Sequence, residues 1–295
     1  MEIIDFYTGS FARRCIVLLG YFDGVHTGHR ALIEHAKKIA ASKKDGEAVG
    51  IMTFYDGKRD GQIYLFEERV QIFASLGLDF VFAAPFHEEF RSMTAQEFLV
   101  RVTKNLNVGA FLCGEDFTFG KDATGNSVTL HEFGKANGIE VFVDKIVAFG
   151  GEKAAATQAK RLLRSGDVEQ LARLLGERYF ICGTVETEGR HIGRKIGFPT
   201  ANIHPSPEKY PLKQGVYAVT VRGDGWEYRG LANYGSRPTF HDASVVLEVY
   251  LDGCFEDLYG KSITVFFDEY IREIKKFESA QQLSLQLKKD LEKIR

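Results

Sequence analysis

The spacing of apolar segments changes near residue 180, and this change constrains the fold more than any other feature of the sequence. Before it, apolar runs alternate with helical patterns, so that a predicted helix over 27–42 lies between predicted strands over 15–19 and 49–54. After it, five predicted strands follow one another closely: 180–185, 216–221, 226–233, 245–251 and 262–267. Alternating strands and helices predict a parallel sheet covered on both faces, whereas closely spaced strands predict an antiparallel sheet or small barrel. We therefore predict two domains, residues 1–180 and 181–295.

Local signals add detail to this outline. Thr94 and Glu97 form a predicted capping box that opens a helix, and Asp224-Gly225 predicts a hairpin turn in the second half. Ser279 is predicted to cap a final helix with one apolar face, made of Leu283, Leu287, Leu291 and Ile294. Further predicted strands are 80–83, 110–113 and 141–143, and further predicted helices are 67–76, 154–164 and 167–175.

Composition narrows the class of protein. The 295 residues are 44% hydrophobic and 26% charged, which is typical of a folded globular protein. A formal net charge of −2 argues against general affinity for nucleic acid or an anionic membrane. The acidic start of the chain does not resemble a signal peptide, and no apolar run is long enough to span a bilayer. The four cysteines are widely spaced, which predicts neither a disulfide framework nor a cysteine metal cluster. We expect a soluble cytoplasmic protein.

A glycine-rich turn follows the first predicted strand, in the segment from Gly20 to His29. Glycines there let the backbone approach a ligand closely, and the N-terminus of the following helix offers unpaired N–H groups to an anion. His26 and His29 are three residues apart, so both can face one phosphate group. This frame favours a phosphate site over the alternative of a surface turn with two incidental histidines.

The same segment reads Gly-x-Phe-Asp-Gly-Val-His-x-Gly-His, and residues 114–120 read Gly-Glu-Asp-Phe-Thr-Phe-Gly. Both resemble the adenylyltransferase half of bifunctional riboflavin kinase/FMN adenylyltransferases, the bacterial FAD synthetases. The resemblance implies that the two histidines lie on the ATP phosphates. It assigns to ATP and FMN binding Gly20, Phe22, Asp23, Gly24, His26, His29, Asp116, Thr157 and Lys160.

The chain departs from that family at two places. Where the family usually carries Pro-His-Pro, this chain reads Tyr-Asp-Gly-Lys at 55–58. Where the family usually reads Ser-Ser-Thr-x-x-Arg, this chain has Ala155, Ala156, Thr157 and Lys160 at the corresponding positions. Lysine keeps the charge of the arginine without its forked geometry. Each lost contact to a charged group costs about 1.5–3 kcal/mol, so weaker adenylyl transfer is expected.

The second half carries a longer match. Residues 189–203 read Gly-Arg-His-Ile-Gly-Arg-Lys-Ile-Gly-Phe-Pro-Thr-Ala-Asn-Ile, which resembles the family's kinase signature. The hydroxyl of Thr200 and the amide oxygen of Asn202 are hard ligands suited to Mg²⁺. The resemblance assigns these two residues to the metal and the ATP phosphates, and adds to ATP binding Gly189, Gly193, Arg194 and Gly197. The alternative is that Pro-Thr-Ala-Asn is only a turn.

Glu248 is the second candidate in the kinase half. It lies in an otherwise apolar strand, where alternation places it on the face of Val246 and Tyr250. By pattern alone, this carboxylate belongs either to a solvated face or to a catalytic site. The family uses the glutamate of this strand as the base that takes the proton from the riboflavin 5′-hydroxyl, and Glu248 matches it. A match over 270–277 makes flavin-site candidates of Arg272, Lys275 and Phe277.

Together these matches imply a Rossmann-like α/β nucleotidyltransferase domain, followed by an antiparallel β-barrel riboflavin kinase domain with a terminal helix. The expected enzyme phosphorylates riboflavin to FMN and adenylylates FMN to FAD, with ATP, riboflavin and FMN as small-molecule partners and Mg²⁺ as the metal. One alternative is a riboflavin kinase with a weak or inactive transferase domain. A further alternative is a flavin-responsive binding protein without catalysis.

Overall fold

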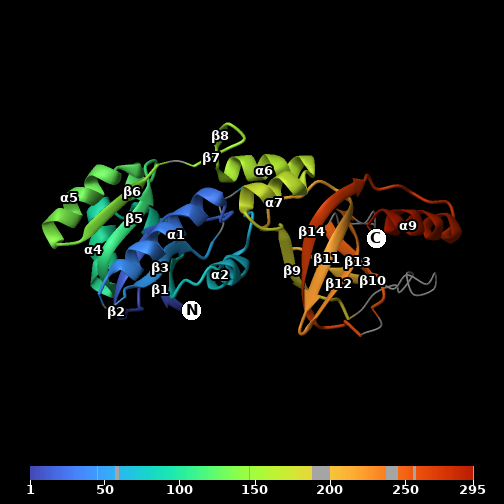
Figure 1. Cartoon of the computed structure of the whole chain (residues 1–295), viewed down its shortest axis with the longest axis horizontal. Helices are drawn as coiled ribbons and strands as arrows, with labels where there is room; N and C mark the ends of the chain where they lie inside the picture. The colour runs from blue at the N-terminus through green and yellow to red at the C-terminus, as the bar shows by residue number, and fades with distance from the viewer. Residues whose placement is uncertain are drawn as a thin grey trace. The chain divides into compact units, whose positions relative to one another are not determined.

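The computed structural model describes residues 1–44, 46–56, 60–145, 147–187, 200–236, 245–254 and 257–294. The chain divides into two compact units, Met1–Ala156 and Thr157–Arg295. Figure 1 shows helices alternating with strands in the first unit, and strands following one another closely in the second. Within the described ranges, no helix is long and apolar enough to cross a membrane.

The first unit contains a six-stranded sheet in the order β1-β4-β3-β2-β5-β6, with every neighbouring pair parallel. Its strands are β1 (Glu2–Asp5), β2 (Phe11–Leu19), β3 (Ala48–Phe54), β4 (Phe80–Ala84), β5 (Leu106–Gly114) and β6 (Glu140–Asp144). Its helices are α1 (Thr27–Ser42), α2 (Phe66–Ser75), α3 (Glu88–Ser92), α4 (Ala95–Asn105) and α5 (Ser127–Asn137), with a 3-10 turn η1 (Lys121–Ala123). A small hairpin, β7 (Ala148–Phe149) and β8 (Glu152–Lys153), follows the sheet.

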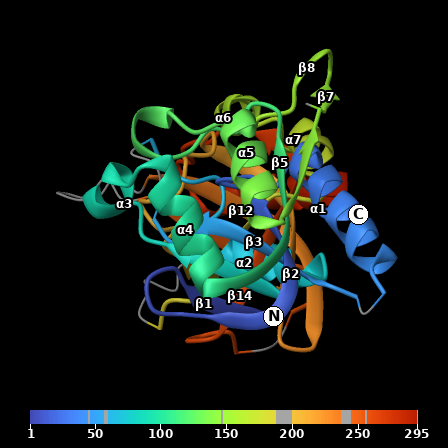
Figure 2. The same cartoon turned by 90° about the vertical axis from the view of Figure 1, so that its left-hand side faces the viewer.

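Helices cover both faces of this sheet, which explains the unbroken apolar run of β2. Cys15, Val17 and Leu19 are buried in a core shared with α4 and α5, whereas Ile16 and Leu18 are buried on the other face. Figure 2 shows α4 and α5 on one side of the sheet and α1 on the other. A strand buried on both faces needs no alternation of polar residues.

The strand order also locates a binding crevice. The chain runs from β2 to β3 in one direction along the sheet and later returns to place β5 on the other side of β2. In open parallel sheets, ligands bind beyond the carboxyl ends of the strands at such a reversal. The segment Gly20–His29 begins there, because β2 ends at Leu19.

The second unit contains a six-stranded antiparallel sheet in the order β10-β13-β12-β11-β14-β9. Its elements are α6 (Ala156–Ser165), α7 (Val168–Leu175), β9 (Phe180–Thr184), β10 (Thr200–Ile203), β11 (Gly215–Gly223), β12 (Trp226–Ser236), β13 (Val245–Leu251), β14 (Ser262–Arg272) and α9 (Ala280–Ile294). The sheet curls, so that Glu186 after β9 donates its backbone N–H to the carbonyl of Asn202 on β10, 2.9 Å away. The predicted fold class, a Rossmann-like α/β domain and an antiparallel barrel-like domain with a terminal helix, is confirmed.

The two faces of the antiparallel sheet differ in character. One face carries buried apolar residues such as Val219, Val265 and Leu247. The other face carries the polar residues Thr220, Asn233 and Glu248, and its apolar residues Val216 and Leu231 pack against Leu291 of α9. The terminal helix therefore covers part of the polar face through the apolar stripe that the sequence predicts.

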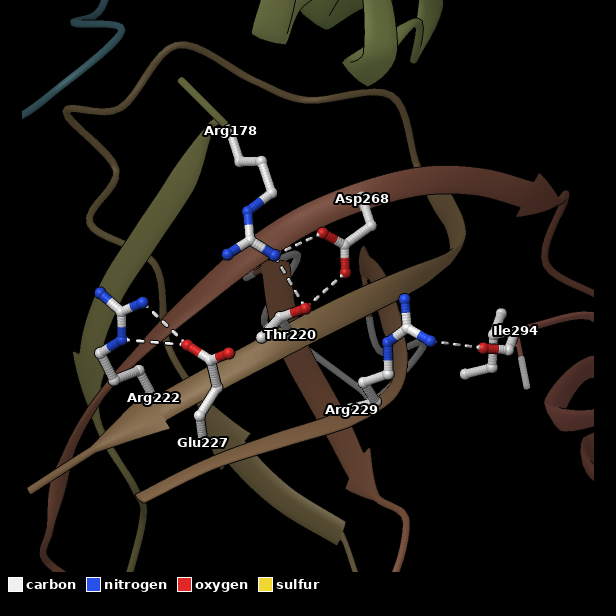
Figure 3. Close-up of polar contacts among 7 residues, drawn as sticks. All are labelled: Arg178, Thr220, Arg222, Glu227, Arg229, Asp268 and Ile294. Atoms are coloured by element: carbon white, nitrogen blue, oxygen red, sulfur yellow. Dashed lines mark hydrogen bonds and ion pairs between the residues drawn. The ribbon is translucent and has the colours of Figure 1, made fainter. Parts of the chain in front are cut away.

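Ion pairs and hydrogen bonds hold other parts of this polar face (Figure 3). Arg178, just before β9, donates from Nη1 to Asp268 of β14 and to Thr220 of β11, both at 2.9 Å. Arg229 of β12 donates to the carbonyl of Ile294 at 3.3 Å, which ties the end of α9 to the sheet. The first contacts tie the segment before β9 to β11 and β14, and the last ties α9 to β12.

The structure contains the capping box and the hairpin turn that the sequence predicts. Thr94 and Glu97 form the predicted capping box, with Glu97 N–H 3.2 Å from Thr94 Oγ1 and Thr94 N–H 2.8 Å from Glu97 Oε2. Gly225 forms the predicted hairpin turn with a φ of +78°. Strand β10 is not among the predicted strands, because its alternation of buried Ala201 and Ile203 with Thr200 and Asn202 covers only four residues, which is too short to identify a strand.

The division between the units differs from the predicted boundary at 180/181. Helices α6 and α7 belong to the second unit. Lys213 donates its backbone N–H to the carbonyl of Leu163 on α6 at 2.9 Å, and α7 packs against β14. Helical periodicity reveals that these helices exist, but the sheet against which they pack is decided by long-range contacts.

Candidate active sites

The first unit contains a cavity of about 890 Å³ beyond the carboxyl ends of β2, β3 and β5. The turn after β2 contributes His26 and His29 to its lining. Other parts of the lining are basic, including Lys145 and Lys153. A third part is aromatic and includes Phe54, Phe86, Phe90, Phe117 and Phe119. The cavity therefore joins a cationic and hydrogen-bonding region to an apolar one.

The two histidines form a stacked pair at the N-terminus of α1. Their ring centroids lie 3.7 Å apart with the planes inclined by 19°. Burial, reinforced by the charge of Lys153, lowers the pKa of His26 to about 4. Burial, with His26 and Lys153 as further causes, holds the pKa of His29 well below its ordinary value. Both rings are therefore neutral at pH 7, and each can donate one N–H to an anion.

Both rings retain hydrogen-bonding capacity for a ligand. Among the described residues, neither His26 Nδ1 nor His29 Nδ1 has a hydrogen-bond partner, although both atoms are buried. Buried polar nitrogens without partners cost free energy, and such costs are typical of sites that await a ligand. Helix α1 has no acidic residue in its first turn to oppose an anion.

Buried residues of the turn that carries the histidines stabilise its conformation. Asp23, which is 3% exposed, accepts a hydrogen bond from the backbone N–H of Ile63 at 2.8 Å. Phe22 is 1% exposed and adopts a φ of +55°, a conformation that costs energy in a residue with a side chain. Its ring packs 4.7 Å from the ring of His29. The strained turn therefore supports the second histidine directly.

The fully buried Arg69 on α2 ties this turn to the adjacent strand. Its guanidinium donates to the carbonyl of Tyr21 at 3.3 Å and to the carbonyl of Phe54 at 2.7 Å. It also donates to Thr53 Oγ1 at 2.7 Å. Nothing in the sequence pattern singles out this arginine, because a single basic residue on a helix is usually solvated.

The second unit places a polar cluster on the face of its sheet that α9 partly covers. Glu248 of β13 pairs in register with Asn202 of β10 on one side and with Asn233 of β12 on the other. Residues directly opposite each other in antiparallel strands project from the same face, so the three side chains form a row. Thr200 donates from Oγ1 to Glu248 Oε1 at 2.9 Å. A carboxylate, a hydroxyl and two amides therefore meet across three strands.

The two side-chain amide oxygens in this cluster are buried and have unused hydrogen-bonding capacity. Asn202 Oδ1 and Asn233 Oδ1 are both buried, and neither has a hydrogen-bond partner in the described part of the chain. Hard oxygen atoms of this kind are the ligands that Mg²⁺ prefers. The cluster therefore fits a hard divalent cation that would satisfy these atoms.

Comparison with known proteins finds a family match in each half of the chain. A family model described as FAD synthetase matches residues 9–158, and one described as riboflavin kinase matches residues 175–295. The chain belongs to the bifunctional riboflavin kinase/FMN adenylyltransferase family.

Named relatives cover nearly the whole chain. The bifunctional riboflavin kinase/FMN adenylyltransferase of Bacillus subtilis is 32% identical over 94% of this chain and 90% of its own length. The enzyme of that name from Escherichia coli K12 is 33% identical over 94% of this chain and 90% of its own length. A crystal structure of a Streptococcus pneumoniae protein, described as a macrolide-efflux protein, superposes with a TM-score of 0.88 at 30% identity, covering 99% of this chain and 98% of that one.

Most of the residues that the resemblance assigns to the adenylyltransferase line the cavity of the first unit. Its lining includes Gly20, Phe22, Asp23, His26, His29 and Asp116. Gly20 has no room for a side chain, since a Cβ there would lie 2.7 Å from the Phe22 ring. Gly24 is buried and does not line the cavity.

The remaining two adenylyltransferase candidates, Thr157 and Lys160, lie on α6 in the second unit. Lys160 is 8% exposed, and its ammonium group lies 4.9 Å from the centroid of the Tyr210 ring in the same unit. Their assignment to the ATP phosphates stays a prediction. By contrast, Ala155 and Ala156 line the cavity, so the hydroxyl groups that the family usually carries there are absent from the site itself.

The kinase candidates of the family divide into two sets. Thr200, Asn202 and Glu248 come together, and Asn233 joins them although the sequence analysis did not select it. The signal that could have found it was the Asn-Tyr-Gly-Ser motif at 233–236. The other predicted ATP ligands lie outside the described residues: Gly189, Gly193, Arg194 and Gly197.

The flavin-site candidates lie where β14 ends. Arg272 pairs in register with Val216, which pairs with Asn233, so Arg272 belongs to the same row across the sheet as Glu248. Its guanidinium lies 5.9 Å from the Phe277 ring centroid and pairs with the fully buried Asp290 of α9 at 2.8 Å. Lys275 is exposed.

Proposed function

We propose that the chain makes FMN from riboflavin and ATP in its second unit, and FAD from FMN and ATP in its first. The single observation that best supports the kinase is the contact between Thr200 and Glu248, which joins the Pro-Thr-Ala-Asn motif to the candidate base. The adenylyltransferase is supported by the stacked histidines at the end of a helix beside an aromatic cavity. Both activities agree with the two matched families.

In the kinase, Glu248 takes the proton from the riboflavin 5′-hydroxyl as that oxygen attacks the γ-phosphorus of ATP. Because Thr200 donates to Oε1, it orients the carboxylate and leaves Oε2 for the substrate. A positioned base contributes about 10²–10⁴ in rate. The new bond joins the flavin oxygen to phosphorus, and the bond to the bridging oxygen of ADP breaks.

Thr200, Asn202 and Asn233 are the residues that would hold Mg²⁺, because their oxygen atoms fit a hard cation. A hydroxyl can donate its proton to Glu248 while its lone pairs face a metal, so the two roles of Thr200 are compatible. When bound, the ion would neutralise charge on the ATP phosphates. Magnesium as the metal is part of the proposal.

In the adenylyltransferase, a phosphate oxygen of FMN attacks the α-phosphorus of ATP, and the bond to the bridging oxygen breaks to release pyrophosphate. The neutral rings of His26 and His29 donate N–H groups to phosphate oxygens, next to the N-terminus of α1. The aromatic part of the cavity, including Phe54 and Phe117, suits the flat flavin ring.

Product analysis tests this function. Incubation with riboflavin, Mg²⁺ and ATP should yield FMN, and incubation with FMN, Mg²⁺ and ATP should yield FAD, with chromatography identifying each product. FMN without FAD would favour a kinase with an inactive first domain, and neither product would favour a flavin-responsive binding protein. The matched families and relatives do not favour these two alternatives. The cytoplasmic location stays a prediction.

A further inference from the structure

The β7–β8 hairpin begins beside the histidine pair. Val147 and His26 both lie close to Gly28 in the first turn of α1. A Cβ added at Gly28 would lie 3.1 Å from His26 Nδ1 and 3.7 Å from the Cβ of Val147. The hairpin closes above Val147, whose carbonyl accepts from the backbone N–H of Ala154 at 2.9 Å. Ala148 pairs with Lys153 in its register. The hairpin therefore places Lys153 close to the N-terminus of α1.

Lys153 lines the same cavity as both histidines and forms an ion pair with Asp116, from the segment after β5. Its side chain is 44% exposed and contributes to the lining of the cavity. Its positive charge contributes to lowering the pKa of both His26 and His29. Since the histidines are neutral at pH 7, they bring hydrogen bonds but no net charge to an anion.

The residues that follow Lys153 in sequence bring no hydroxyl group and no positive charge to the cavity, so Lys153 would supply the charge that an anion needs. Ala155 and Ala156 line the cavity without hydroxyl groups, and the side chain of Lys160 is buried in the second unit against Tyr210. A triphosphate carries several negative charges, and a site that binds it needs compensating positive charge as well as N–H donors.

We propose that Lys153 binds the phosphate groups of ATP in the adenylyltransferase cavity and stabilises the departing pyrophosphate. The ammonium group has three N–H donors, so it can keep Asp116 as a partner while it donates to phosphate oxygens. As FMN oxygen bonds to the α-phosphorus, the electron pair of the breaking bond passes to the pyrophosphate oxygen. Lys153 neutralises the charge that develops on this leaving group. This inference rests on the proposed adenylyltransferase function.

The test compares Lys153→Met with Lys135→Met, which removes an exposed lysine of α5 in the same unit. For FAD formation from FMN, Lys153→Met should lower kcat/KM for ATP by about ten- to hundredfold, the equivalent of losing one charged hydrogen bond. Lys153→Arg should recover part of this loss, because the charge returns. Lys135→Met should match wild type, and FMN formation from riboflavin should stay unchanged in every variant.

A binding measurement separates failure of this inference from failure of the proposed function. Titration of inorganic pyrophosphate into the full-length protein by calorimetry should show weaker binding to Lys153→Met than to wild type and Lys135→Met. Equal pyrophosphate affinity, or FAD formation by Lys153→Met within twofold of wild type, would overturn the role of Lys153. If wild type forms no FAD at all, the adenylyltransferase function fails, and the pyrophosphate titration alone decides on Lys153.

Discussion

Thr200 and Glu248 are 48 residues apart in sequence, yet the hydroxyl of one donates to the carboxylate of the other at 2.9 Å. The contact spans β10 and β13, adjacent strands of the curled sheet. It brings the candidate metal ligand and the candidate base of the kinase half into direct contact.

Glu248→Gln should reduce FMN formation by about 10²–10⁴, because the amide cannot accept the proton of the riboflavin hydroxyl. Its similar shape retains an acceptor for Thr200, so the fold and ATP binding should persist. Steady-state assays of FMN formation measure the loss. Glu227→Gln, which changes a carboxylate on the same sheet paired with Arg222, serves as control and should have little effect. Near-normal turnover of Glu248→Gln would show that this residue is not the base.

Asn233→Ala should raise the Mg²⁺ concentration needed for half-maximal FMN formation by roughly tenfold, the equivalent of about 1.4 kcal/mol. The physical reason is that the buried Asn233 Oδ1 lies beside Glu248 with no partner in the described residues, and a cation would use it. Metal titrations of kinase activity give the value. FAD formation from FMN should keep its normal Mg²⁺ dependence, and an unchanged requirement in the kinase would remove Asn233 from the metal site.

Asp290→Ala should destabilise the second unit by about 3–5 kcal/mol, since it leaves the guanidinium of Arg272, only 12% exposed, without its buried partner. Thermal unfolding measures this change. Because Arg272 also loses its orientation beside Phe277, KM for riboflavin should rise more than kcat falls. Asp290→Asn, which keeps an acceptor, should have a smaller effect. A destabilised variant with an unaltered KM for riboflavin would show that the pair only stabilises the fold.

The double substitution Ala155→Ser and Ala156→Ser should increase kcat/KM for FAD formation by roughly tenfold. Both alanines line the cavity, where a new hydroxyl group would donate to a phosphate oxygen, and one such hydrogen bond at the low end of the usual range of about 1.5–3 kcal/mol gives this gain. Initial rates with FMN and ATP test this expectation. Ala136→Ser on the exposed face of α5 is the control. No gain from the double variant would mean that hydroxyls at these positions do not reach the nucleotide.

Acidification should destabilise the first unit through His26. Its folded pKa of about 4 lies below the ordinary value of 6.5, chiefly because of burial, so the unfolded chain binds the proton more readily. The stabilising contribution is present above pH 6.5 and is lost as pH falls toward 4, amounting to about 2 kcal/mol between pH 7 and pH 5. Unfolding measured from pH 7 to pH 5 in wild type and His26→Gln tests this. The variant should show a smaller loss, and identical pH profiles would contradict it.

Several features could be read without a structure because they depend on residues close in sequence. Consecutive apolar residues in 15–19 predict a strand buried on both faces, and alternation around Glu248 predicts the face on which it lies. The Thr94 capping box and the Asp224-Gly225 turn are likewise local. Resemblance to a family then supplied roles for Thr200, Asn202 and the two histidines.

By itself, therefore, the sequence determined the two kinds of sheet, most of their elements and the motifs at each site. Contacts between residues far apart in sequence place Asn233 next to Glu248, pair Asp290 with Arg272, and bring Lys153 into the cavity that the histidines line. They also place α6 and α7 with the second sheet. Periodicity reports which side of an element is buried, whereas strand register and helix packing arise from contacts between distant residues, and these have no local signature.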